Sequence, residues 1–395
     1  MTTDRPPRIA VIFARFGPYH LTRLEAAGRY ATSLGGEVIG VEVARRDSVY
    51  QWDIAKGSRD FHRVTVFEDT NYHQLTKWHI AYKVYRLLGE IKPDAVALPG
   101  WVYPEARAGL AWCSLHHKVA IVMSASTRAD ASRVWWREWL KSRIIHRFDA
   151  ALVGGTQQST YIQELGMPAD RIFTGYNAVD NAYFASESDR LREKTVQLRA
   201  DMGLPSNYFL SITRFVPVKN LLRFLEAYAL YRERAGHSAW DLVLCGDGPL
   251  KSDILQVIAD KSIGKYVHLP GFIQYDVLPT YYALANAFIL PSVKETWGLV
   301  VNEAMACGLP VLVSNRCGCA PDLVKDGVNG YTFDPYNTEY MADRMLELHR
   351  RKNALPEMGC ASREIISEHG PHRFAQGLWQ AMCVVKGIEN NEIID

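Results

Sequence analysis

Short apolar runs alternate along the chain with longer segments in which apolar residues recur every three or four positions. The runs are short enough for buried strands, and the segments between them are long enough for helices. Strands that alternate with helices favour a parallel sheet covered by helices. The predicted strands of the first half are residues 8–13, 38–43, 63–67, 95–98, 119–123, 150–153 and 172–175, and its predicted helices include 20–34, 71–90, 104–117 and 131–147.

A second α/β unit begins after residue 204. Residues 181–204 are charged and lack a strand pattern, so we place the interdomain connection there. The alternation then resumes, which predicts domains at residues 1–182 and 183–370, followed by an amphipathic helix at 371–390. Ligands of such sheets bind beyond the carboxyl ends of the strands, which predicts a site in the cleft between the domains. The second set of strands is 208–213, 240–245, 267–269, 288–290, 311–313 and 331–333.

The stretch from residue 291 to 314 has the clearest chemical pattern. A buried strand leads into a loop with Glu295, then into a helix that begins near residues 297–299 and carries Glu303. That helix ends at Gly308-Leu-Pro310, a glycine stop followed by proline. The free N–H groups at a helix start favour a diphosphate, and nearby carboxylates accept hydrogen bonds from sugar hydroxyls. The donor-binding candidates of this stretch are Thr296, Trp297, Gly298, Leu299, Val300 and Glu303, beside Glu295.

A second cluster follows the first strand of the second domain. Arg214 and Lys219 lie five positions apart where the chain leaves a strand and enters a helix. Two fixed cations at a strand end can hold a pyrophosphate and neutralise it as it departs. An exposed polar turn is the alternative interpretation, because Lys and Arg are common in such turns.

Together these motifs resemble the retaining glycosyltransferases of family 4, which have the GT-B fold of two facing Rossmann-like domains. The resemblance is carried by Glu295-x7-Glu303, the following Ala-Met-Ala-Cys-Gly-Leu-Pro-Val and the Asp326–Gly330 turn. It implies that the C-terminal helix packs back on the first domain. It also implies that Arg214 and Lys219 grip the donor phosphates, that Glu303 binds the ribose, and that Glu295 lies by the donor sugar.

Two further glycine turns resemble family elements. Cys245-Gly-Asp-Gly-Pro matches a sharp turn near the cleft, with Gly246 and Gly248 in backbone regions that other residues avoid. Gly271 and Phe272 belong to a segment whose backbone holds the nucleotide base in the family. As a dinucleotide fingerprint the first turn fails, because Lys251 stands where a third glycine is required, and this disfavours an NAD-dependent dehydrogenase.

The sequence departs from the family pattern at two places. Thr296 stands where many relatives have glycine, so the donor sugar cannot be transferred by analogy. The loop at 124–127 holds no histidine, although many relatives have one there. His20, which follows Gly17-Pro18, is a substitute near the cleft, and with Gly17 it is a candidate for substrate binding. A surface or helix-capping histidine is the alternative interpretation.

Composition narrows the class of protein. The 395 residues are 48% hydrophobic and 22% charged, as in soluble globular proteins of two domains. A net charge of +2 gives no case for nucleic-acid binding. We find no signal-peptide layout and no apolar run that could span a membrane, so we expect a cytoplasmic protein whose seven cysteines form no disulfides. Cys317-x-Cys319 lacks a partner pair for zinc.

We expect neither a cofactor nor a metal. No two Asp residues lie two positions apart, so the divalent-cation motif of many sugar-nucleotide enzymes is missing. Arg214, Lys219 and the helix start can supply the positive charge instead. Metal-independent transfer is the resulting prediction.

In the first domain, one helix has two interpretations, and two further residues are candidates for the acceptor side. The helix at 131–147 is rich in Trp and Arg, which suits docking on an anionic bilayer and hence membrane association at the cytoplasmic face. We favour instead a packing helix, with Trp135, Trp139, Ile144 and Ile145 facing the core. Trp101 and Glu105 follow a strand end and are candidates for lining the acceptor side.

The sequence therefore predicts a retaining hexosyltransferase. Its donor is a nucleoside-diphosphate sugar, most simply UDP- or GDP-linked, and its acceptor is a hydroxyl of a saccharide, a lipid-linked group or a small molecule. Such an enzyme serves the biosynthesis of polysaccharides, glycolipids or glycoconjugates. The alternatives are another GT-B enzyme, such as a sugar phosphorylase or a sugar-nucleotide epimerase, and a non-catalytic sugar-nucleotide sensor.

Overall fold

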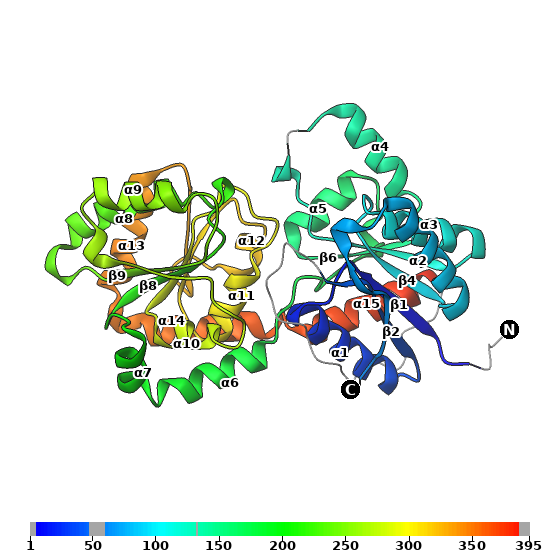
Figure 1. Cartoon of the computed structure of the whole chain (residues 1–395), viewed down its shortest axis with the longest axis horizontal. Coiled ribbons are helices and arrows are strands. Elements are labelled where there is room, and N and C mark those ends of the chain that lie inside the picture. The colour runs from blue at the N-terminus through cyan, green and yellow to red at the C-terminus, as the bar shows by residue number, and fades with distance from the viewer. Residues whose placement is uncertain (1–4, 47–59, 132, 387–395) are drawn as a thin grey trace. The chain divides into compact units, whose positions relative to one another are not determined.

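The computed structural model describes residues 5–46, 60–131 and 133–386, and the chain divides into two compact units (Figure 1). Unit 1 comprises Met1–Val179 and His369–Asp395, and unit 2 is Asp180–Glu368. The boundary falls three residues before the one expected from the sequence. None of the helices among the described residues is long and apolar enough to cross a lipid bilayer.

Unit 1 is built on a seven-stranded parallel sheet of order β3-β2-β1-β4-β5-β6-β7. The strand order reverses between β1 and β4, which are parallel neighbours in the sheet. The seven predicted strands are all present, with β2 and β3 longer than predicted. Their bounds are β1 Arg8–Phe13, β2 Glu37–Arg46, β3 His62–Asn71, β4 Ala95–Pro99, β5 Val119–Ser124, β6 Ala150–Val153 and β7 Ile172–Thr174.

Helices cover both faces of this sheet, because successive strand residues point to opposite faces. Ala10 and Ile12 of β1 pack with α2, α3, α4 and α5 on one face. Ile9 and Val11 pack with α1 and α15 on the other face. The helices are α1 Pro18–Ser33, α2 Lys77–Ile91, α3 Pro104–His116, α4 Trp135–Ile145, α5 Thr156–Glu164 and α15 Pro371–Lys386.

The last helix, α15, packs against the start of the chain. Phe374 and Leu378 of α15 are buried against α1 and the sheet. Gly175 lets the helix approach closely, because its φ is +107° and a Cβ there would meet the carbonyl carbon of Arg373 at 2.6 Å. The buried Arg23 of α1 donates from Nη1 to the carbonyl of Tyr176 at 2.5 Å and lies over the ring of Phe374. Residues 387–390, the expected end of this helix, lie outside the described residues.

Unit 2 is a six-stranded parallel sheet of order β10-β9-β8-β11-β12-β13, and its order reverses between β8 and β11. The sheet is enclosed by helices and contains all six predicted strands. The elements are α6 Asn181–Arg192, α7 Thr195–Met202, β8 Tyr208–Ile212, α8 Leu221–Ala235, β9 Asp241–Cys245, α9 Lys251–Asp260, β10 Val267–Gly271, α10 Leu278–Leu284, β11 Ala287–Leu290, α11 Leu299–Ala306, β12 Val311–Ser314, α12 Ala320–Leu323, β13 Gly330–Phe333, α13 Thr338–Arg350 and α14 Leu355–Ser367.

Residues 181–204, where we placed the interdomain connection, contain no strand, as expected, and form α6 and α7. Helix α6 packs on α10 and α11 of unit 2. The packing interpretation of α4 was wrong for its tryptophans. Trp135 and Trp139 are exposed, whereas Ile145 is buried and Ile144 is partly buried.

Candidate functional site

The reversal point of the unit 2 sheet brings Lys219 and Glu295 together. Lys219 follows β8 and Glu295 follows β11, which are neighbouring strands, so both residues lie beyond the carboxyl edge. Their side chains are partly exposed and form an ion pair between Nζ and Oε2. In open parallel sheets this reversal point is the usual place for a bound ligand. The structure therefore joins one of the two predicted cations to one of the two predicted carboxylates.

Asn220 fixes the loop that carries Lys219. It has a left-handed backbone, with φ of +58°, and begins α8. Its Nδ2 donates to the carbonyl of Pro291 at 3.2 Å and to that of Pro335 at 2.8 Å. It thereby ties the segments that follow β8, β11 and β13 to one another. Val293 adds a backbone bond of 2.9 Å to the carbonyl of Val218.

The loop from Glu295 to Gly298 is held by its backbone. The carbonyl of Glu295 accepts from the N–H of Gly318 at 2.9 Å, and the carbonyl of Trp297 accepts from that of Cys319 at 3.2 Å. The indole of Trp297 is buried and donates to Asn302 Oδ1 at 2.9 Å. The Trp297 side chain is therefore part of the scaffold, and only its backbone remains a candidate for ligand contact.

Gly298 is the N-cap of α11 and has a φ of +107°. No side chain caps this helix start and no acidic residue lies in its first turn. The first N–H groups of a helix lack partners within the helix and attract anions. The backbone of Gly298, Leu299 and Val300 thus offers an anion site next to Glu295. Thr296 lies exposed between Glu295 and the buried Trp297.

Glu303 lies deeper than the sequence suggests. Its side chain is fully buried, and its Oε2 accepts a hydrogen bond of 2.7 Å from the Tyr282 hydroxyl. Burial raises the pKa of the nearby Tyr275, and the charge of Glu303 raises it further. A ribose hydroxyl can reach Glu303 only after this polar cluster rearranges. The structure thus brings Glu295 and Glu303 into one loop and helix but exposes only the first.

Arg214 lies in a tight turn at the same edge. Its side chain is exposed and forms no ion pair with any residue in the described part of the chain. The N–H of Phe215 donates to the carbonyl of Asp247 at 2.8 Å, so the two loops are packed together. Gly246 permits this approach, because its φ is +141° and a Cβ there would meet the Thr213 carbonyl oxygen at 1.8 Å.

The predicted base-binding segment lies next to that turn. The N–H of Gly246 donates to the carbonyl of Gly271 at 2.7 Å. Gly271 has a φ of +88°, and Phe272 beyond it is exposed. Arg214, Gly246, Gly271 and Phe272 therefore border one edge of the sheet, as the sequence predicted.

Two hydroxyl groups at this edge were missed by sequence reasoning. Thr213 and Ser292 follow β8 and β11, and their buried oxygens have no hydrogen-bond partner among the residues described. A buried polar group without a partner is costly and marks a place where a ligand or ordered water can bind. Serine and threonine are too common for the sequence to single these two out. Only the neighbouring strands reveal them.

In unit 1, Gly17 and His20 begin α1 beyond β1. The N–H of Gly17 donates to His20 Nδ1 at 3.0 Å, and the imidazole packs on Phe13 in a tilted orientation with ring centroids 4.4 Å apart. Burial lowers the pKa of His20 well below its usual 6.5, and Arg23 and Arg15 lower it further. The imidazole is therefore neutral, with its proton on Nε2. This geometry makes His20 a helix-capping group and a hydrogen-bond donor rather than a free base.

Trp101 and Glu105, proposed to line the acceptor side, are buried in unit 1. The Tyr72 hydroxyl lies 3.1 Å and 3.2 Å from the two Glu105 oxygens, and burial raises the pKa of Glu105. Both residues shape the edge from within and do not line it.

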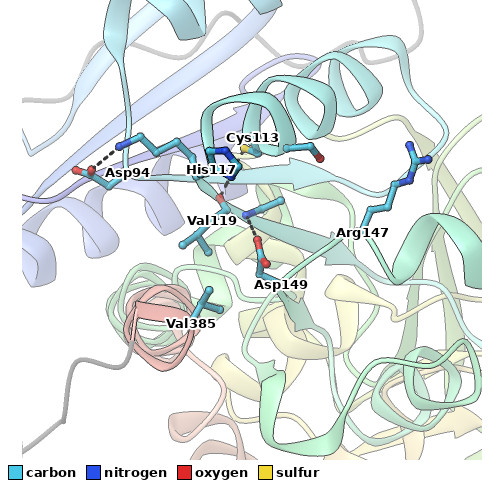
Figure 2. Close-up of a pocket in the computed structure, with 10 residues that line it drawn as sticks. Asp94, Cys113, His117, Val119, Arg147, Asp149 and Val385 are labelled. Carbon is cyan, nitrogen blue, oxygen red and sulfur yellow. Dashed lines mark hydrogen bonds and ion pairs between the residues drawn. The ribbon is translucent and has the colours of Figure 1, made fainter.

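Unit 1 has a cavity of about 430 Å³ at the amino edge of its sheet, opposite the edge at which Gly17 and His20 lie. Figure 2 shows the residues that line this cavity. Its carboxylates are engaged: Asp94 accepts from Lys118 Nζ at 3.2 Å, and Asp149 accepts from the N–H of Ala120 at 2.8 Å. Val385, near the end of the described chain, also lines it. None of the residues predicted for the site lies there, so this cavity is separate from the predicted site.

Comparisons with known proteins find similarity to glycosyltransferases. Residues 198–365 match the family model described as glycosyl transferases group 1. The chain is 28% identical over 385 residues to the sulfoquinovosyl transferase SQD2 of Arabidopsis thaliana. The aligned region covers 91% of this chain and 70% of the plant protein. It is 30% identical over 179 residues to a GDP-mannose-dependent α-(1-6)-phosphatidylinositol monomannoside mannosyltransferase of Mycobacterium tuberculosis, covering 44% of each. Apart from the plant protein, the chain spans about half or less of the length of the curated relatives it matches.

Solved structures share the fold over nearly the whole chain. Anabaena Alr3699/HepE in complex with UDP superposes with a TM-score of 0.72 at 16% identity, covering 96% of this chain and 100% of that chain. This likeness confirms the expected GT-B fold with its Rossmann-like domains.

The role of Asn220 can be tested by unfolding. Asn220→Gly keeps the left-handed backbone but removes all three side-chain hydrogen bonds, two donated by Nδ2 and one accepted from Arg223, so we expect a loss of about 1–2 kcal/mol in the free energy of unfolding. Asn220→Ala should lose about 1 kcal/mol more, since alanine disfavours this backbone. Ser262→Ala is the matched control, because Ser262 is exposed and also has a positive φ, of +55°. A glycine variant as stable as the wild type would show that the amide does not tie these loops.

The neutral state of His20 predicts a pH dependence. Because the folded-state pKa lies below the usual 6.5, the unfolded chain takes up a proton first as the pH falls. Stability contributed by neutral His20 is therefore present above pH 6.5 and is lost as the pH falls from there toward the folded-state pKa. In urea unfolding at a series of pH values, His20→Gln should flatten this decline, since glutamine can cap the helix without titrating. The same change at the exposed His372 is the control. An unchanged slope in His20→Gln would contradict the assignment.

Proposed function

We propose that this chain, whose residues 198–365 match the model of glycosyl transferases group 1, is a retaining, metal-independent glycosyltransferase. It moves a sugar from a nucleoside-diphosphate sugar to a hydroxyl acceptor in the biosynthesis of a glycan, glycolipid or glycoconjugate. The observation that carries the proposal is the Lys219–Glu295 ion pair beside the uncapped start of α11. The complex of a similar structure with UDP and the GDP-mannose dependence in a relative's name support a UDP- or GDP-linked donor.

The donor diphosphate competes with Glu295 for Lys219. When the phosphates bind, Nζ turns to them and Glu295 is released to accept hydrogen bonds from the donor sugar. Arg214 and the N–H groups of Gly298–Val300 add positive charge where negative charge develops on the leaving group. We therefore include no metal in the proposal, because these fixed groups supply the charge compensation. Glu303 takes the ribose hydroxyls after Tyr282 gives up its bond.

The chemical step replaces one bond to the anomeric carbon with another. The bond from that carbon to the diphosphate oxygen breaks, the acceptor oxygen bonds on the same face, and the acceptor proton passes to the departing phosphate. Because the departing phosphate takes the proton, the reaction needs no basic side chain of the protein. His20, neutral and with its proton on Nε2, donates a hydrogen bond to a substrate oxygen rather than removing a proton.

Replacing Lys219 tests this assignment. Lys219→Ala should lower kcat/KM by about 10²-fold or more, because it removes a charge contact to the leaving group in the transition state. Lys265→Ala, a change at another exposed lysine of unit 2, should leave the rate unchanged. Thermal melts show whether both variants remain folded. A folded Lys219→Ala enzyme with near-normal rates would remove Lys219 from the mechanism.

Ligand binding tests the donor class. Thermal unfolding is followed with UDP, GDP, ADP, dTDP and NAD, each in EDTA and again with magnesium. A ligand at about one hundred times its dissociation constant adds about 2.7 kcal/mol of stability. We expect one nucleoside diphosphate to stabilise the protein equally in both conditions. Stabilisation only with magnesium would contradict metal independence, and stabilisation by NAD alone would overturn the proposed function.

Product analysis separates the proposal from its alternatives. A retaining transferase forms a glycoside with the anomeric configuration of the donor and depends on an acceptor. An epimerase changes the sugar nucleotide alone, and a phosphorylase requires inorganic phosphate. A sensor binds the donor but yields no product with any acceptor.

A further inference from the structure

Two ionic side chains of helix α4, Glu138 and Lys141, face the protein. Glu138 accepts from Lys141 Nζ at 2.8 Å and from the Tyr161 hydroxyl at 2.8 Å. Arg133 donates to the same Tyr161 hydroxyl at 2.8 Å, and Tyr161 is a buried residue of α5. This network anchors the inner side of α4, together with the buried Ile145.

The outer side of α4 is apolar. The exposed fractions are 80% for Trp135, 45% for Trp136, 53% for Trp139 and 46% for Leu140. In a globular protein these side chains would normally face the core, and exposing several large ones together marks an interaction surface. The ionic groups of the inner network occupy the side of α4 that faces the protein, and the tryptophans lie on the other side. The exposure is therefore a property of the folded helix.

Cations are interleaved with these rings. The guanidinium of Arg137 lies 5.2 Å from the ring centroid of Trp136, and that of Arg143 lies 5.0 Å from that of Trp139. Both arginines are exposed. We call these six residues the α4 surface: Trp135, Trp136, Arg137, Trp139, Leu140 and Arg143.

The same face of unit 1 continues this character. Helices α2 and α3 pack on the same side of the sheet as α4. Of the carboxylates on these three described helices, Glu105 is buried and Glu138 is held in the inner network, which leaves Glu90 exposed. On α2, on α3 and in the loop before α3, the exposed large apolar residues are Trp78, Tyr82, Val102, Tyr103 and Leu115, and the exposed Lys and Arg residues are Lys77, Lys83, Arg86 and Arg107.

We propose that the α4 surface docks unit 1 on an anionic lipid bilayer. Tryptophan suits the boundary between headgroups and acyl chains, and each basic residue near an anionic membrane adds about 1 kcal/mol of attraction. Arg137 and Arg143 can bind lipid phosphates while the rings beside them enter the interface.

The position of α4 links this surface to the proposed function, on which this step rests. α4 follows β5 and lies at the outer edge of unit 1, beyond α5 (Figure 1). The loop before it leaves the carboxyl end of β5, which is also the edge where Gly17 and His20 follow β1. Docking therefore brings a bilayer next to the edge that receives the acceptor. The acceptor class implied is a hydroxyl carried by a membrane lipid.

Vesicle co-sedimentation of the full chain, without donor, tests the docking. We expect the protein to sediment with phosphatidylcholine vesicles that contain phosphatidylglycerol, and far less with phosphatidylcholine alone or at high salt. Arg137→Ala with Arg143→Ala should lower the partition coefficient by about 30-fold, from the loss of two basic contacts. Trp135→Ala with Trp139→Ala should lower it by about tenfold or more.

Matched controls come from unit 2. Leu255→Ala and Arg350→Ala change exposed residues of the same kinds and should leave the partition coefficient unchanged. Circular dichroism checks the fold of each variant. If the alanine variants of tryptophan fail to fold, quenching by brominated lipids replaces them: it should fall in Trp135→Phe with Trp139→Phe, while binding persists.

Three results would overturn the proposal. The wild type could remain in solution with anionic vesicles at low salt. The folded Trp→Ala or Arg→Ala variants could bind as well as the wild type. Alternatively, light scattering without vesicles could reveal self-association that Trp139→Ala abolishes, which would assign the surface to a second copy of the chain. If the protein binds vesicles but transfers no sugar, the docking proposal stands and the proposed function is wrong.

Discussion

The candidate site of unit 2 depends on one side chain, the amide of Asn220. Parallel strands end at a common edge, but the loops beyond them are free to diverge unless something joins them. Asn220 joins them by donating to carbonyls that follow β11 and β13 while its own backbone begins α8. Its oxygen accepts from Arg223 at 2.7 Å, so the whole amide is engaged. Because Lys219 directly precedes Asn220, these hydrogen bonds also fix the position of its backbone.

The Lys219–Glu295 pair explains how opposite charges coexist at an edge that is partly closed to water. Each neutralises the other in the structure, so neither carries the full cost of partial burial alone. In the mechanism that we propose, an incoming diphosphate replaces one anion with another beside Lys219. That exchange of partners would then require only side-chain movements and no change in the sheet.

Much of the fold was predictable from the sequence, because strand-forming runs in a parallel sheet are continuous and apolar. All thirteen predicted strands exist, and Gly246 and Gly248 adopt backbones that favour glycine, as predicted. The predictions failed where burial depends on partners far apart in the sequence. Trp135 resembles a core residue until Glu138 and Tyr161 are seen to occupy the inner side of α4. Ser292 shows nothing in the sequence that would distinguish it from other serines.

The return of α15 to unit 1 has a consequence for biosynthesis. Phe374, Leu378 and Met382 complete the core beneath α1, and they are among the last described residues to be made. On the ribosome, all of unit 2 is therefore translated before one face of the first sheet has its cover. That face, with Ile9 and Val11 at its centre, has α1 as its early cover and lacks the part that α15 supplies until unit 2 has been made. The core of unit 1 is therefore completed only after unit 2 has been translated, although its strands are made first.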